Sequence, residues 1–352
     1  FNFIPGEKLN TLEAQFENDA QLIPEFGMDS TWTYYREDKD LNGQINSGDK
    51  VYLYGGMRMG GSNYYALNLT SLTSPTLLFA IQGGSTGFTR MGQTWSQPVI
   101  TTIRLGGYSR KVMIFGGGYD PRHETAGQMF SGEDLGNQIY IVDAFTGEKL
   151  WSASGTASDS ASVTVSDMKF SIPSSVKAID TNGDGFTDNL YFGDLGGQVF
   201  RIDFNKTPTS TSNLVKRVRL IAKVGQTGGT ADALNQRRFY EPPAIGLFTD
   251  SASRKFVTVA LGSGYRSHPL NIQTDDHFFV LFDYDVMRSD LLTLTATQEA
   301  LAEASGGLQA VITKANLAQL TDSSTAGADV TNKKGWFYDF TASGEKVLTK
   351  AD

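Results

Sequence analysis

Oxygen-bearing side chains recur at alternate positions between residues 180 and 188. The segment reads Asp-Thr-Asn-Gly-Asp-Gly-Phe-Thr-Asp and ends on its third carboxylate. A hard dication such as calcium takes roughly six to eight oxygen ligands, so a chain that binds it bends and offers an oxygen at about every second residue. The spacing therefore predicts a calcium loop whose ligands are Asp180, Asn182, Asp184, the main-chain carbonyl of Phe186, and Asp188.

A second segment, residues 38–49, fits the twelve-position calcium template. Gly43 stands at the sixth place, and Asp49 stands at the twelfth, where the template prefers Glu. This segment predicts a second calcium site with the candidate ligands Asp38, Asp40, Asn42, Gln44, Asn46 and Asp49. The alternative for both segments is a solvated turn, because Asp, Asn and Gly also favour ordinary turns.

Both loops lie between short apolar runs rich in β-prone residues. Residues 31–35 and 51–54 flank the 38–49 loop, and residues 175–179 and 189–192 flank the 180–188 loop. The metal would therefore close a β-hairpin rather than join two helices, which excludes an EF-hand. Similar hairpins at 105–110 and 249–254 lack the ligand pattern. The hairpin itself thus does not require the acids.

The strand pattern recurs at intervals of about 60 to 80 residues, and repeated units built only of strands suggest propeller blades. Each of four units has a strand, a turn, a strand ending in Gly, and a strand ending in Asp or Asn. The sequence therefore predicts an all-β fold, a β-propeller that is seven-bladed or a partial array, with loop and helical insertions. We expect one propeller domain over residues 1–352, as a fragment of a longer protein, with a helical and loop insertion at 291–330.

Composition narrows the possible functions. The net charge is −8 with scattered basic residues, so nucleic acid is not an expected partner. No run reaches the roughly 18 apolar residues of a membrane span. Cysteine is absent, which excludes disulfides and thiol chemistry in this chain. Calcium loops of modest affinity favour an extracytoplasmic location, where calcium is plentiful.

Catalytic signatures are weak. The three histidines, His123, His268 and His277, show no zinc-ligand spacing on a helix. No nucleophile elbow or catalytic triad motif occurs. We therefore expect a binding protein without catalytic residues, not an enzyme.

Several local motifs run through most of the chain. They are YGGMRMGG at 54–61 with YYAL at 64–67, WSQP at 95–98, FGGGYD at 115–120, GDLGGQVFRID at 193–203, and GWFY at 335–338 before GEKVL at 344–348. In this order they resemble the PilC/PilY family of type IV pilus tip-associated proteins. The resemblance implies a C-terminal β-propeller whose calcium loop is the 180–188 segment. It also implies a role in pilus biogenesis, in pilus extension and retraction, in surface adhesion and in twitching motility. The implied partners are major or minor pilins, other tip components, and a host or abiotic surface. The implied location is the cell surface, pilus tip or periplasm of a Gram-negative bacterium.

A second family shares one segment. Residues 140–151, YIVDAFTGEKLW, look like one repeat of the quinoprotein dehydrogenase propellers, which hold pyrroloquinoline quinone over a calcium ion. That resemblance implies a periplasmic oxidoreductase as the alternative function. The other units do not repeat this motif, and we expect Trp151 to pack one blade against the next.

Overall fold

A computed structural model describes residues 2–17, 25–46, 48–124, 135–156, 160–225, 236–321, 330 and 332–351. The described residues are mostly β, in four sheets. The first sheet contains β1 (Thr33–Glu37), β2 (Lys50–Gly56), β3 (Tyr64–Asn68) and β4 (Thr76–Ile81). The second contains β5 (Val99–Leu105), β6 (Tyr108–Gly116), β7 (Gln138–Asp143), β8 (Lys149–Ser154) and β9 (Val163–Thr164).

The other two sheets repeat this plan. The third contains β10 (Lys177–Ile179), β11 (Asn189–Gly193), β12 (Gln198–Phe204) and β13 (Val215–Lys223). The fourth contains β14 (Ala244–Thr249), β15 (Lys255–Gly262), β16 (His277–Asp283), β17 (Ala318–Leu320) and β18 (Gly335–Asp339). Strands are antiparallel to their neighbours, apart from the parallel pairs β8–β9 and β17–β18.

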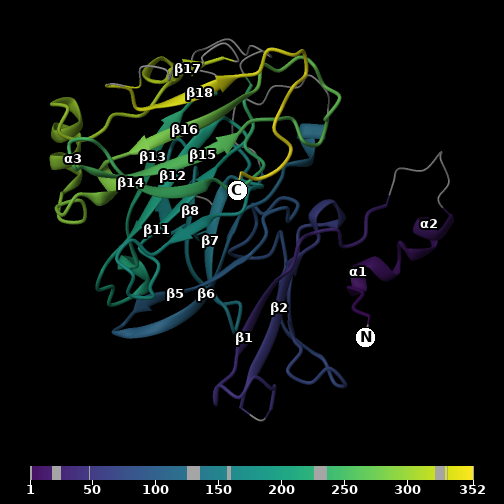
Figure 1. Cartoon of the computed structure of the whole chain (residues 1–352). Coiled ribbons are helices and arrows are strands. Elements are labelled where there is room, and N and C mark those ends of the chain that lie inside the picture. Colours follow the sequence, from purple (N-terminus) through teal and green to yellow (C-terminus); the bar gives the residue numbers. More distant parts are fainter. Residues whose placement is uncertain are drawn as a thin grey trace.

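The sheets follow one another in chain order, from the purple β1–β2 hairpin to the yellow β18 (Figure 1). First strands of successive sheets touch, β1 against β5 and β5 against β10. Consecutive sheets of four or five strands that touch along their first strands are blades arranged as in a propeller. The predicted all-β, propeller-like fold is thus confirmed, and the described part of the chain forms four blades.

The core lies between the sheets. One apolar cluster joins the first and second sheets, another the second and third, and another the third and fourth. Strand β6 shows the cause, because successive side chains point to opposite faces. Val112 and Ile114 enter the cluster shared with the third sheet, whereas Met113 and Phe115 enter the cluster shared with the first. Trp151 is 1% exposed in the cluster between the second and third sheets, where the sequence placed it.

Glycine ends each second strand, and at Gly116 and Gly193 it allows the segment that leads into the next blade to approach closely. A Cβ on Gly116 would lie 2.3 Å from the carbonyl oxygen of Ile172, which leads into the third sheet. A Cβ on Gly193 would lie 2.7 Å from Cβ of Phe239, which leads into the fourth. A larger residue at either place would force the two blades apart. Close approach therefore explains the recurrent Gly.

The Asp or Asn at the end of each third strand has its own role. The side-chain Oδ1 of Asn68, Asp143 and Asp283 accepts a hydrogen bond from a main-chain N–H two residues later, at 3.0, 2.9 and 3.1 Å. This is an Asx turn, which ends the strand by offering the backbone a local acceptor. The fourth member, Asp203, is instead fully buried in an ion pair with Arg201.

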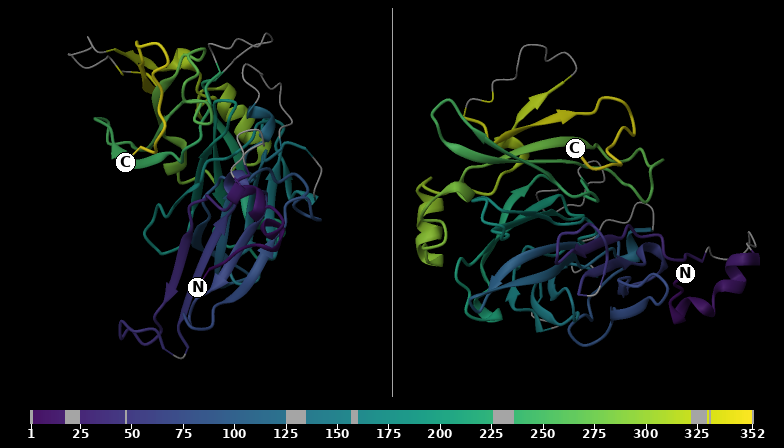
Figure 2. Two further views of the ribbon diagram at one scale, coloured as in Figure 1. Left: turned by 90° about the vertical axis from the view of Figure 1, so that its right-hand side faces the viewer. Right: turned by 60° about the horizontal axis from the view of Figure 1, so that its bottom comes forward.

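Short helices lie outside the sheets. They are α1 (Gly6–Leu9), α2 (Leu12–Glu17) and α3 (Ala296–Ala304), with 3-10 turns η1 (Arg58–Gly60), η2 (Pro121–Glu124), η4 (Thr211–Asn213), η6 (Asp285–Met287) and η7 (Lys314–Asn316). The N-terminal helices and α3 lie on opposite sides of the molecule (Figure 2). No helix in the described ranges is long and apolar enough to cross a membrane.

The segment predicted as an insertion, 291–330, holds α3, η7 and β17, and β17 pairs with β18 of the fourth sheet. Its residues 322–329 lie outside the described ranges. Helix α3 is fixed to the third sheet by ion pairs of Arg217 with Glu299 (2.8 Å) and of Arg219 with Glu303 (3.5 Å).

Candidate metal centre

The 180–188 segment forms a closed loop between β10 and β11. Asp180 is its centre: Oδ1 accepts the N–H of Gly183 and Oδ2 accepts the N–H of Gly185, both at 2.7 Å. Asp188, directly before β11, closes the loop by accepting the N–H of Thr181 at 2.9 Å. Gly183 and Gly185 have φ of +78° and +85°, which a side chain disfavours. The glycines therefore permit the turn that brings the acids round Asp180.

The 38–49 segment repeats this arrangement between β1 and β2. Asp38 Oδ2 accepts the N–H of Gly43 at 2.8 Å, as Asp180 accepts that of Gly185. Asp49, directly before β2, accepts the N–H of Lys39 at 2.8 Å, as Asp188 accepts that of Thr181. The two loops thus have the same local fold at the same place in two blades.

One residue of the 38–49 loop differs in type from its counterpart in the 180–188 loop. Leu41 stands where the later loop has Gly183 and takes a φ of +58°. A leucine in the left-handed region carries a steric cost that glycine avoids.

The distances between the carboxylates differ between the two loops. Asp38, Asp40 and Asp49 bring ligand oxygens within 4.8 Å of one another. The three carboxylates of the 180–188 loop do not converge as closely, and the carboxylate of Asp184 pairs with Arg104 of β5 at 2.6 Å. The loop that fits the spacing rule better is therefore not the one whose carboxylates lie closest together.

The other predicted ligands lie within the two loops. Asn46 donates its side-chain amide to Asp40 at 3.2 Å, and its N–H donates to Asp49 at 2.8 Å. Asn42 Oδ1 accepts the N–H of Gln44 at 2.7 Å. In the later loop Asn182 Oδ1 accepts the N–H of Asp184 at 2.9 Å, and Asp184 Oδ1 accepts the N–H of Phe186 at 3.1 Å.

Hydrogen bonds and a nearby charge favour the ionised form of three of the loop acids, Asp180, Asp184 and Asp49. Burial acts to raise the pKa of Asp180, but hydrogen bonds from main-chain N–H groups outweigh it and lower the pKa. The Arg104 guanidinium lowers the pKa of Asp184. Main-chain N–H groups of Lys39 and Asn46 lower the pKa of Asp49. Anionic oxygens are what a hard dication requires.

The donor sets therefore suit calcium in both loops. Each offers three carboxylates and at least one amide oxygen within one short turn, and neither contains nitrogen or sulfur ligands that would favour zinc. The side chains that would hold the ion are those of Asp180, Asn182, Asp184 and Asp188 in one loop, and those of Asp38, Asp40, Asn42 and Asp49 in the other.

The sequence did not point to Arg104. This residue is far from the loop in the chain, and no motif marks it. It reaches Asp184 only because β5 lies beside the loop, where Thr102 O accepts the N–H of Thr187 at 2.9 Å.

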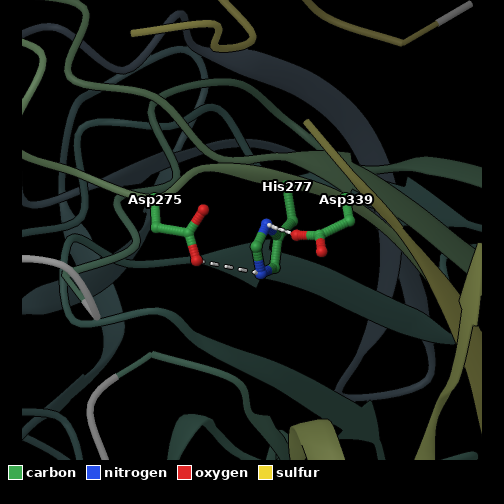
Figure 3. Close-up of side chains that lie close together, drawn as sticks. All are labelled: Asp275, His277 and Asp339. Carbon is green, nitrogen blue, oxygen red and sulfur yellow. Dashed lines mark ion pairs between the residues drawn. The ribbon is translucent and has the colours of Figure 1, made fainter. Parts of the chain in front are cut away.

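A third group, Asp275, His277 and Asp339, also brings ligand atoms together (Figure 3). The imidazole of His277 lies between the two carboxylates, with Nδ1 at 3.3 Å from Asp339 and Nε2 at 3.9 Å from Asp275. Two cationic groups already point at Nε2, Arg237 Nη2 at 2.9 Å and Lys314 Nζ at 2.6 Å. A metal cation at this nitrogen would meet both positive charges, so the geometry opposes a metal site here.

The protonation state of His277 follows from the same contacts. Nε2 faces two donors and acts as the acceptor, so Nδ1 carries the proton, 2.5 Å from the carbonyl oxygen of Asp276. Burial, together with the charges of Arg237 and Lys314, lowers the pKa of His277 to about 4. The imidazole is therefore neutral near pH 7, and its Nε2 links β16 to Arg237 and Lys314.

The architecture has a counterpart among solved structures. The C-terminal domain of PilY1 from Pseudomonas aeruginosa aligns with 99% of this chain and 69% of its own length, with a TM-score of 0.61 and 18% identity. The chain has the fold of that domain. At this identity the likeness concerns the fold alone.

Other comparisons add little. A quinohemoprotein alcohol dehydrogenase from Pseudomonas putida aligns with 74% of this chain and 33% of its own, with 11% identity and a TM-score of 0.32. A β-propeller domain from Myceliophteria thermophila aligns with 66% of this chain and 52% of its own, with 8% identity and a TM-score of 0.30. Neither score supports an argument about this chain. No protein-family model and no curated protein sequence matches it.

Proposed function

We propose that this chain is a calcium-binding propeller domain of a type IV pilus-associated protein, located outside the cytoplasm of a Gram-negative bacterium. The observation that carries the proposal is the alignment of 99% of the chain with the PilY1 C-terminal domain. Two sequence features support it. The local motifs resemble the PilC/PilY family, and the 180–188 loop stands where that resemblance places a calcium loop.

The loop acids explain how calcium would act. Bound calcium would supply two positive charges that offset the clustered carboxylates. Asp180 and Asp188 hold the two ends of the loop through main-chain N–H groups. The loop is also fastened to the second sheet, because the hydroxyl groups of Thr187 and Thr101 lie 2.7 Å apart. Ordering the loop therefore stiffens the junction between two blades.

A stiffened junction suits a part that bears load in a pilus. The proposed role is to control pilus extension and retraction and to support adhesion and twitching motility. Pilins and other tip components are the proposed partners, together with a host or abiotic surface. These assignments rest on the family resemblance and are open to direct test in cells.

Calorimetric calcium titration of the isolated chain tests the metal sites. We expect two binding events in the unmodified chain, of which Asp188→Ala removes one and Asp49→Ala removes the other. Each variant should keep its fold, because the apolar clusters between sheets do not include the loops. Asp250→Ala is the control: Asp250 lies in the corresponding hairpin of the fourth sheet and pairs with Arg254 at 2.8 Å.

The outcomes separate the parts of the proposal. No binding in the unmodified chain would reject calcium as the ligand. Equal loss of binding in Asp250→Ala would mean that the loops are not the sites. In cells, twitching zones of a strain whose full-length protein carries Asp188→Ala should shrink relative to the Asp250→Ala strain. Equal zones would reject the pilus role of this loop.

A further inference from the structure

Arg104 reaches across a blade junction into the 180–188 loop. Its Nη2 donates to Oδ2 of Asp184 at 2.6 Å, and its guanidinium carbon lies 4.0 Å from the centre of the Phe186 ring. Both charged side chains are about one-third exposed, 32% for Arg104 and 35% for Asp184. The arginine therefore pairs with the carboxylate of Asp184 and stacks on the ring of Phe186, two residues later in the loop.

The position of Arg104 is fixed on both sides. Two residues earlier, Thr102 O accepts the N–H of Thr187, and Thr101 lies 2.7 Å from the hydroxyl of that same threonine. Two residues later, Gly106 N–H donates to Pro208 O at 2.8 Å. Strand β5 thus presents the guanidinium to the loop from a docked backbone. The contact is part of the junction and not a chance meeting of two long side chains.

The arginine and a dication would use the same carboxylate. Asp184 has two oxygens: Oδ1 accepts the Phe186 N–H at 3.1 Å, and Oδ2 accepts Arg104. A metal drawn to this carboxylate would lie within a few ångströms of the guanidinium, and like charges at that range repel. We propose that Arg104 is a built-in competitor for the cation, which lowers the calcium affinity of the 180–188 loop. This inference rests on the proposed function.

The 38–49 loop provides an internal comparison. There the place of Asp184 is taken by Asn42, whose neutral amide donates to Asp40 at 2.7 Å. Arg36 pairs with Asp38 at 3.1 Å, but it comes from the adjoining strand β1 and is 44% exposed. The guanidinium of Arg36 is therefore less constrained beside its loop than that of Arg104 is beside the 180–188 loop. The two loops, alike in backbone, should fill at different calcium concentrations, the 38–49 loop first.

Calorimetric calcium titration of a chain in which only the 180–188 loop can bind tests whether Arg104 lowers the affinity. The parent carries Asp49→Ala, so that only the 180–188 loop titrates. Adding Arg104→Gln should tighten calcium binding by about three- to tenfold at low salt, because an exposed charge pair is weak and the metal carries two charges. Arg104→Lys keeps the charge and should stay within about twofold of the parent.

Arg110→Gln is the matched control. Arg110 lies in the same β5–β6 hairpin but pairs with Asp143 of its own sheet at 2.8 Å. Its loss removes one positive charge without freeing a loop carboxylate, so affinity should change by less than about twofold. A direct readout accompanies the titration: the guanidinium ¹⁵N–¹H signal of Arg104 should shift on calcium saturation, as the pair with Asp184 breaks.

The outcomes are distinct. If the parent binds calcium and Arg104→Gln binds it equally or more weakly, the competitor is rejected and the calcium site stands. If neither binds calcium, the proposed calcium site at the 180–188 loop fails, while the 38–49 loop is judged by titration of the unmodified chain. If Arg104→Gln does not fold, the Arg104 signal in the parent decides: an unchanged signal at saturation rejects the competition, and a shift supports it.

Discussion

Arg201 offers the sharpest test of how the blades are held together. This side chain on β12 is fully buried, and it bridges two carboxylates from neighbouring sheets. Nε lies 2.7 Å from Asp203 of the third sheet, and Nη1 lies 2.5 Å from Asp283 of the fourth. The phenol of Tyr191 donates to Asp283 at 2.9 Å. Burial opposes the charge on Arg201, but the two carboxylates outweigh it and raise the pKa of the guanidinium above its usual value.

Replacing this arginine with methionine keeps an unbranched apolar chain but removes the close cationic partner of both carboxylates. Asp203 keeps the more distant Arg217 Nε, at 3.4 Å. Removing one partner of a buried ion pair costs about 3–5 kcal/mol, because the remaining charge stays out of water. For 352 residues, an unfolding entropy of about 2.1 cal/mol/K per residue amounts to about 0.7 kcal/mol/K. Arg201→Met should therefore lower the Tm by about 4–7 °C.

Differential scanning calorimetry measures this shift. The control is Arg254→Met, which breaks a pair with Asp250 whose arginine is 68% exposed and should cost less than about 1 kcal/mol. Adding Asp203→Asn and Asp283→Asn to Arg201→Met should recover part of the loss, since the buried groups are then neutral. A Tm within about 1 °C of the unmodified chain would refute the reasoning that this network is a charged bridge between blades.

Two further predictions concern single residues. Leu41→Gly should stabilise the chain by about 0.5–1 kcal/mol, because Leu41 has φ +58° and is 87% exposed, so strain is relieved with little lost packing; denaturant titration measures the change, and a less stable variant would contradict it. The folded-state pKa of His277, about 4, lies below its usual 6.5. Between these values the unfolded chain binds the extra proton, so the contribution of His277 to stability is complete above pH 6.5 and is lost as the pH falls toward 4. An NMR titration should find the imidazole neutral at pH 5.5, and a midpoint near 6.5 would count against this account.

The local part of the architecture was readable from the sequence. Alternating apolar residues, a glycine ending each second strand, and an Asp or Asn at or next to the end of each third strand are short-range patterns, and each recurs in the strands of the structure. The hairpin positions of both candidate loops followed in the same way, because Asp49 and Asp188 each directly precede a second strand. The insertion at 291–330 was less readable: β17 lies within it, and its parallel pairing with β18 depends on a partner beyond the segment predicted as an insertion.

The sequence did not predict which of the two loops brings its carboxylates closer together. Spacing favoured residues 180–188, yet the carboxylates of Asp38, Asp40 and Asp49 lie closer together. In the 180–188 loop, a contact between distant parts of the chain engages one carboxylate, since Arg104 on a neighbouring blade pairs with Asp184. No pattern within either loop records that contact.

The sequence alone determined the oxygen-bearing side chains of the two loops and the strands that flank them, because both depend on residues near one another in the chain. What only the tertiary structure decided was which charges meet: Arg104 with Asp184, Arg201 with Asp203 and Asp283, and two cations with His277. Packing of blade against blade sets these meetings. Coulombic interactions depend on distance in space, and separation along the chain does not specify that distance.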